Sequence, residues 1–109
     1  MQEADAIQAL VALGHPMRLR VFRALVVAGE SGLTPGTMAE GLGIGATALS
    51  FHLKELSTAG LVTQQRDGRY LVYRAAYDRM NGLLGYLTEN CCQGAPCGVP
   101  AAASCCAST

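Results

Sequence analysis

The sequence contains no run of about 18 apolar residues, the length that a membrane-spanning helix needs. It has no excess of either charge, because eight lysine and arginine residues balance eight aspartate and glutamate residues. Its first residues are acidic and lack a positively charged stretch, so we expect no secretory signal and a cytoplasmic location. No cysteine occurs before residue 91. Because no apolar run is long enough, we expect no membrane partner. Because the expected location is the cytoplasm, a reducing compartment, we expect the cysteines to be free thiols.

The zero net charge hides a division along the chain. Residues 15–74 carry a net charge of +3, and the remaining residues carry −3. A basic middle segment with acidic ends mildly favours an anionic partner. The chain has 109 residues, half of them hydrophobic, which is material for one small domain that a dimer interface would help to stabilise.

Apolar spacing and capping residues predict five helices, over residues 3–13, 16–28, 35–41, 46–58 and 78–90. Pro16 stands at the first position of the second helix, and Thr34 is the expected N-cap of the third. Asp78 is the expected N-cap of the last. The third and fourth helices are joined by the tight connection Gly43-Ile44-Gly45, and together they have the form of a helix-turn-helix.

The fourth predicted helix has two faces of different character. Leu49, Leu53 and Leu56 repeat at helical spacing and are expected to face the core. The residues between them are expected to face outward as a polar strip with one aromatic ring: Thr47, Ser50, Phe51, His52 and Lys54. Such a strip has the size and the hydrogen-bonding groups to enter a DNA major groove. A plain solvated face is the alternative on the evidence of this helix alone.

The next segment favours DNA binding over a plain solvated face. Extended runs over 61–66 and 69–74 are separated by Asp67-Gly68, which predicts a β-hairpin with a type I′ turn. Arg66 and Arg69 flank its tip, where they would contact phosphates or a minor groove. Tyr70 and Tyr73 are expected to pack rather than to contact DNA. The sequence therefore predicts a mainly α fold in the order α-α-α-α-β-β-α, with the hairpin as a wing.

Four segments carry a specific combination of residues: Leu13-Gly14-His15-Pro16-Met17-Arg18-Leu19, Leu49-Ser50-Phe51-His52-Leu53-Lys54-Glu55-Leu56, Ala59-Gly60-Leu61-Val62 and Arg66-Asp67-Gly68-Arg69-Tyr70. Together they resemble the ArsR/SmtB family over roughly residues 5–90. Members of that family are bacterial winged-helix homodimers that repress metal or metalloid resistance genes and release DNA when an inducer binds. The resemblance implies a winged helix-turn-helix domain over residues 1–90 and a dyad-symmetric, double-stranded operator as partner.

The resemblance also implies where the chain dimerises. In the family the first and last helices form the dimer interface. The chain has an apolar stripe on each of the corresponding segments, and a monomer of this size would struggle to cover both. The residues expected at the interface are Ile7, Leu10, Val11, Met80, Leu83, Leu84 and Leu87.

All five cysteines lie within the last nineteen residues, a segment without charge. We expect residues 91–109 to form a flexible, cysteine-rich tail that binds an inducer. Thiolates select soft ions such as As(III), Cu(I), Zn(II) and Cd(II). Two sensor sites of the family cannot be formed here, because residues 35–42 contain no cysteine and because Met80 follows Asp78 where the zinc site needs a histidine. Neither His15 nor His52 is an expected ligand.

Cys91-Cys92 and Cys97 remain, in an arrangement similar to that of some arsenic-responsive members. Trivalent arsenic favours three sulfurs in a pyramid, whereas zinc takes four ligands. The resemblance implies As(III), or Sb(III), as the inducer held by these three thiolates, with Cys105 and Cys106 as additional ligands or a second weak site.

Other functions stay open at this point. A divalent soft-metal sensor would bind Cd, Pb or Zn through a fourth ligand, and a thiol-redox sensor would form a disulfide such as Cys92–Cys97. A metal-buffering protein would bind metal without an operator. No enzyme, catalytic residue or catalytic cofactor is expected, because Cys91-Cys92 stand at a helix C-terminus, where the helix dipole disfavours the reactive thiolate.

Overall fold

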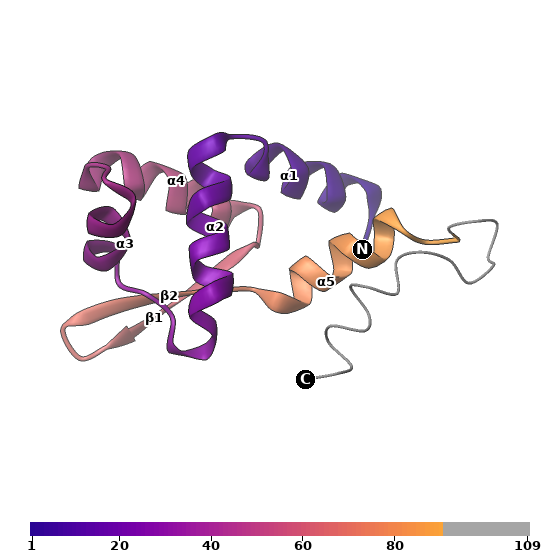
Figure 1. Ribbon diagram of the computed structural model, residues 1–109. Helices are drawn as coiled ribbons and strands as arrows, with labels where there is room; N and C mark the ends of the chain where they lie inside the picture. The colour runs from indigo at the N-terminus through magenta and orange to yellow at the C-terminus, as the bar shows by residue number, and fades with distance from the viewer. Residues whose placement is uncertain (91–109) are drawn as a thin grey trace.

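The structure is a computed structural model that describes residues 1–90 (Figure 1). The elements of this part are α1 (Glu3–Leu13), α2 (Pro16–Ala28), the short 3-10 turn η1 (Gly29–Ser31), α3 (Pro35–Leu42), α4 (Ala46–Thr58), β1 (Val62–Asp67), β2 (Tyr70–Ala75) and α5 (Tyr77–Leu87). The predicted winged helix-turn-helix order is confirmed. None of the helices described here has the length and hydrophobicity of a membrane span.

Hydrogen bonds from capping residues set the starts of α2 and α3, and a glycine sets the end of α3. Nδ1 of His15 accepts a hydrogen bond from the backbone N–H of Met17 at 3.1 Å, which caps α2. Oγ1 of Thr34 accepts one from the N–H of Thr37 at 3.3 Å, which caps α3. Gly43 ends α3 with a left-handed φ of 68°, a conformation that glycine adopts without strain. The helices predicted over 3–13, 16–28 and 46–58 are confirmed to the residue.

The hairpin turn differs from its prediction by one residue. Asp67 pairs with Tyr70, so the two-residue loop is Gly68-Arg69 rather than Asp67-Gly68. Gly68 has a φ of 63°, and among the described non-glycine residues only Asn90 has a positive φ. A left-handed residue at the first loop position alone is the pattern of a Gly-X turn, and the predicted type I′ turn is wrong.

The last helix also starts and ends earlier than predicted. Ala76, not Asp78, is its N-cap, and Asp78 lies in the first turn. The backbone N–H of Ala76 donates to the carbonyl of Leu61 at 2.8 Å, and the Tyr77 hydroxyl donates to the carbonyl of Val26 at 3.1 Å. These tertiary bonds fix the chain just before Asp78, so the helix starts there.

The core lies where α1, α2, α4 and the base of the hairpin meet. It contains Val21, Phe22, Leu25, Met38, Leu49, Leu53, Leu56, Leu61, Val62 and Leu83. Helix α1 packs on it with its alanines, Ala6, Ala9 and Ala12. The larger residues Ile7, Leu10 and Val11 therefore remain 53%, 44% and 67% exposed.

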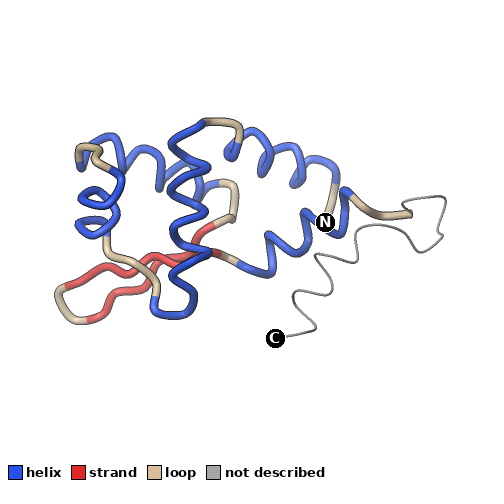
Figure 2. Tube along the Cα trace, viewed as in Figure 1, coloured by secondary structure: helices blue, strands red, loops and turns tan. Residues whose placement is uncertain are grey.

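The elements are divided between the two ends of an elongated molecule. Helices α3 and α4 and the hairpin lie at one end, whereas α1 and α5 lie next to each other at the other (Figures 1 and 2). Leu33, between η1 and α3, exchanges two backbone hydrogen bonds with Tyr73 of β2, at 2.9 and 2.8 Å. This bridge supports a two-stranded hairpin that would be marginal alone.

Candidate nucleic-acid interface

One side of α4 presents an exposed stripe of mixed chemistry. Thr47, Ser50, Phe51 and Lys54 are all exposed, and their spacing of three, four and seven residues places them on one face of the helix. Phe51 is 55% exposed, so its ring is available for contact with a partner. The outward orientation predicted for these four residues is confirmed.

His52 does not belong to that stripe. Its side chain is only 9% exposed, so its predicted place on the outward face is wrong. The reason is geometric, because the helix turns His52 towards the same side as Leu49, Leu53 and Leu56, which are all buried. His52 offers little surface to a base edge, and we leave it out of the set of candidate DNA contacts.

His52 instead belongs to a small cluster beneath the stripe. Its ring centroid lies 4.8 Å from that of His15 and 5.8 Å from that of Phe51. Its Nδ1 is buried and has no hydrogen-bond partner among the described residues. Burial lowers the pKa of His52, and the nearby His15 and Arg18 lower it further. The neutral imidazole is therefore the form that the fold favours.

Arg18 connects this cluster to α1. Its Nη1 donates to the carbonyl of Ala12 at 3.4 Å, and its guanidinium carbon lies 6.0 Å from the centroid of the Phe51 ring. A cation over an aromatic face is attracted by the ring quadrupole. Arg18 therefore helps to hold Phe51 in its exposed position.

The wing lies at the same end of the molecule as α3 and α4 (Figure 1). Arg66 on β1 and Arg69 in the turn are both exposed, as predicted. Tyr70 is 65% exposed, so its expected packing role is wrong, whereas Tyr73 packs against the core. The position of Tyr70 directly after the turn was the available signal, since a strand end next to a loop has little to pack against.

Arg74 has a structural task in the wing. Its Nε donates to the carbonyl of Glu30 at 2.6 Å, and its Nη1 donates to Oε1 of Gln65 at 2.9 Å. These bonds join β2 to β1 and to η1, which follows α2. We define the reading surface as the exposed residues that α4 and the wing present together: Thr47, Ser50, Phe51, Lys54, Arg66 and Arg69.

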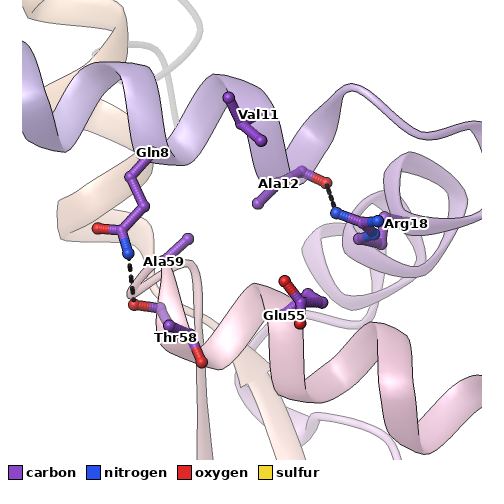
Figure 3. A pocket seen from close by; sticks show the side chains of 7 residues that line it. All are labelled: Gln8, Val11, Ala12, Arg18, Glu55, Thr58 and Ala59. Atoms are coloured by element: carbon purple, nitrogen blue, oxygen red, sulfur yellow. Dashed lines mark hydrogen bonds between the residues drawn. The ribbon is translucent and has the colours of Figure 1, made fainter.

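A pocket of about 200 Å³ lies where α1 meets α4. Figure 3 shows Gln8 of α1 donating to the carbonyl of Thr58 near the end of α4, at 3.4 Å. Val11, Arg18, Glu55 and Ala59 also line this pocket. The end of the helix that carries the reading surface is thus attached to a helix of the opposite end of the molecule.

The predicted metal ligands lie outside the described residues. These are Cys91, Cys92 and Cys97, with Cys105 and Cys106 as additional candidates. Within residues 1–90 no three histidine, cysteine, aspartate or glutamate side chains come together as a metal site.

The predicted dimer residues fall into two groups. Ile7, Leu10 and Val11 on α1 and Leu84 and Leu87 on α5 are exposed, by 40 to 67%. Leu83 is 5% exposed because it packs into the core of its own chain, so its predicted role at the interface is wrong. Met80 is half-buried and packs against the same core.

A helix-turn-helix with an exposed polar stripe on its second helix, flanked by a cationic β-wing, defines a winged helix-turn-helix DNA-binding protein. A family model described as a helix-turn-helix domain matches residues 13–65. The HTH-type transcriptional regulator YgaV of Escherichia coli is 30% identical over 93 residues, which are 83% of this chain and 92% of YgaV.

Two solved structures extend the comparison. An ArsR-like transcriptional regulator from Rhodococcus sp. RHA1 superposes with a TM-score of 0.70 at 26% identity, over 77% of this chain and 76% of that one. A structure described as a possible transcriptional regulator for arsenical resistance gives a TM-score of 0.63 at 31% identity, over 73% and 80%. The chain belongs to the ArsR family of winged helix-turn-helix transcriptional regulators. Its relatives are regulators of transcription and not enzymes.

Proposed function

We propose that this chain is a homodimeric repressor of a metalloid-resistance operon, which leaves its operator when As(III) binds to its C-terminal thiolates. Sb(III), with the same lone pair and preference for sulfur, is the second inducer proposed. The proposal has three parts, namely DNA binding by the reading surface, dimerisation through α1 and α5, and inducer capture by the cysteines.

The reading surface is the observation that carries the proposal. Ser50 and Thr47 supply hydroxyls for base edges, and the ring of Phe51 suits contact with a thymine methyl group. Lys54, Arg66 and Arg69 supply cations for phosphates. All six side chains are exposed, and the elements that carry them lie at the same end of the molecule (Figure 1). We therefore propose that they bind one DNA duplex together.

Dimerisation is supported by the apolar residues that α1 and α5 leave exposed. Ile7, Leu10, Val11, Leu84 and Leu87 form apolar surface at the end opposite to the wing. Contact between two copies through this surface would place two reading surfaces outward, related by a two-fold axis. A two-fold protein reads a dyad-symmetric operator, with half-sites about one helical turn apart.

Inducer capture is supported by sequence chemistry. Cys91 and Cys92 follow α5, which ends at Leu87, and Cys97 comes five residues after Cys92. Three thiolates at this short spacing match the pyramidal sulfur coordination of As(III). A relative named for arsenical resistance has 31% identity with this chain, which favours the same class of inducer.

One titration tests the proposal against its alternatives. Fluorescently labelled duplex DNA from the region upstream of the gene is bound to the full chain, and anisotropy is followed while As(III), Sb(III), Cd(II), Zn(II) or peroxide is added separately. Release by As(III) and Sb(III) alone supports the proposal. Release by Cd(II) or Zn(II) at lower concentration identifies a divalent-metal sensor, and release by peroxide that a dithiol reverses identifies a redox sensor.

A further inference from the structure

The beginning of α5 is fastened to the end of α4 by two hydrogen bonds. Nε of Arg79, on α5, donates to the carbonyl of Ala59, the C-cap residue of α4, at 3.2 Å. The backbone N–H of Ala76 donates to the carbonyl of Leu61 at 2.8 Å. The backbone bond holds the chain just before α5. Among the side-chain hydrogen bonds of residues 1–90, that of Arg79 is the one that runs from α5 to the end of α4.

The same guanidinium also reaches α1. Nη1 of Arg79 lies 4.0 Å from Oδ2 of Asp5, in the first turn of α1. The Arg79 side chain is 32% exposed, so this ion pair is partly shielded from water. One side chain therefore contacts the two helices of the proposed dimer interface and the reading helix α4.

The chemistry of a helix end explains why an arginine suits this position. The last carbonyls of a helix lack intrahelical partners and carry the negative end of the helix dipole. Helix α4 has no basic residue in its own last turn, so Arg79 supplies the cation and the donor from outside. Gly60 makes room for it, because a Cβ there would lie 2.7 Å from Nε of Arg79.

We infer that Arg79 is the positioning residue that sets the orientation of α4 relative to α1 and α5, and so couples the dimer end of the molecule to the reading surface. The inference rests on the proposed function for the identity of the inducer. In this inference, capture of As(III) just beyond α5 weakens DNA binding through a change at α5 that reaches α4. Arg79 provides that contact without itself belonging to the reading surface.

Three variants of the full chain separate the two contacts of Arg79. Arg79→Met removes both contacts and retains much of the aliphatic stem. Asp5→Asn removes the ion pair and keeps the bond to Ala59. The double variant lacks both contacts at the wild-type net charge, so it controls for the change in Coulombic attraction to DNA. For each variant the operator Kd is measured with and without As(III). The Kd with As(III) divided by the Kd without it is the coupling factor.

We expect As(III) to raise the operator Kd of the wild type by about tenfold or more. Arg79→Met and the double variant should bring this ratio close to one, while Asp5→Asn keeps most of it. If Arg79→Met has the same ratio as the wild type, the inference is overturned.

Urea unfolding of each variant shows whether it is folded. If Arg79→Met is not folded, Arg79→Lys replaces it. Lysine has one nitrogen in place of the separate Nε and Nη1 that contact Ala59 and Asp5, so it should give an intermediate ratio, whereas an unchanged ratio contradicts the inference.

A second readout does not depend on the inducer. Operators with two or four base pairs inserted between the half-sites are compared with the native spacing. The wild type should discriminate strongly, and Arg79→Met should discriminate less because the bond that fixes the end of α4 to α5 is lost. If As(III) fails to release the wild type, the proposed inducer is wrong and this spacing test alone decides. Undiminished discrimination by Arg79→Met then overturns the role of Arg79.

Discussion

At the scale of single residues, the buried imidazole of His52 links stability to pH. Burial, His15 and Arg18 lower its pKa below the ordinary value of about 6.5, so the unfolded chain binds a proton more readily than the folded one. The contribution of His52 to stability is complete above about pH 6.5 and is lost as the pH falls towards the lowered pKa. We predict that the free energy of unfolding falls between pH 7.5 and 5.5.

Urea unfolding of the wild type and of His52→Leu across this pH range isolates the effect. The leucine variant should have a flatter pH dependence. It should also retain much of the stability at neutral pH, because it removes a buried nitrogen without a partner among the described residues. Equal pH dependence in the two proteins would show that His52 does not titrate differently on folding.

Arg69 and Ser50 are expected to fail in different ways when truncated. Arg69 is exposed in the wing turn, so Arg69→Ala should weaken binding to every DNA sequence and reduce the slope of log K against log salt by about one. Ser50→Ala should instead relax preference at one base pair, at a cost of about 1–3 kcal/mol. Binding to operator and unrelated duplexes over a salt series measures both. The roles are misassigned if Arg69→Ala loses only sequence preference.

The residues that were predicted wrongly share a physical cause. His52, Leu83 and Tyr70 were placed by periodicity within one element, which cannot tell how far a neighbouring element covers a face. Thr47, Ser50, Phe51 and Lys54 were placed correctly because they lie opposite a strong leucine stripe. The exposure of a residue at the margin of a stripe depends on tertiary packing.

At the scale of elements, the N-cap of α3 is expected to stabilise the helix-turn-helix. Oγ1 of Thr34 accepts from the N–H of Thr37, so Thr34→Ala should lower the free energy of unfolding by about 1 kcal/mol. Thr37→Ala, which removes the neighbouring hydroxyl but leaves the cap acceptor, is the control and should cost less. Urea unfolding compares them, and equal losses would contradict a capping role for Thr34.

Most element boundaries could be predicted because short-range chemistry decides them. Proline at N1, the Thr34 cap and the left-handed glycine at residue 43 act within one turn of chain. The hairpin turn could not be predicted because it depends on the register between the two strands. The start of α5 could not be predicted because the hydrogen bonds of Ala76 and Tyr77 join residues distant in sequence. Alanines rather than larger residues pack α1 on the core for a similar reason, since the space available is set by α2 and α4.

At the scale of the whole molecule, the exposed apolar surface of α1 and α5 predicts the oligomeric state. Leu10→Glu places a charge within this surface and should convert the dimer to a monomer, as light scattering after gel filtration would show. Operator affinity should then fall by about a hundredfold, because two half-sites no longer bind together. Val27→Glu is the control, since Val27 is 82% exposed on α2. A dimeric Leu10→Glu would contradict the proposed interface.

The central claim is that capture of As(III) by thiolates beyond α5 releases the reading surface from DNA. The most direct test measures operator affinity of the full chain and of Cys91→Ser/Cys92→Ser, with and without As(III), with Cys105→Ser/Cys106→Ser as control. We predict equal affinity for all three proteins without As(III), and release by As(III) of the wild type and the control only. Normal release of Cys91→Ser/Cys92→Ser would contradict the claim.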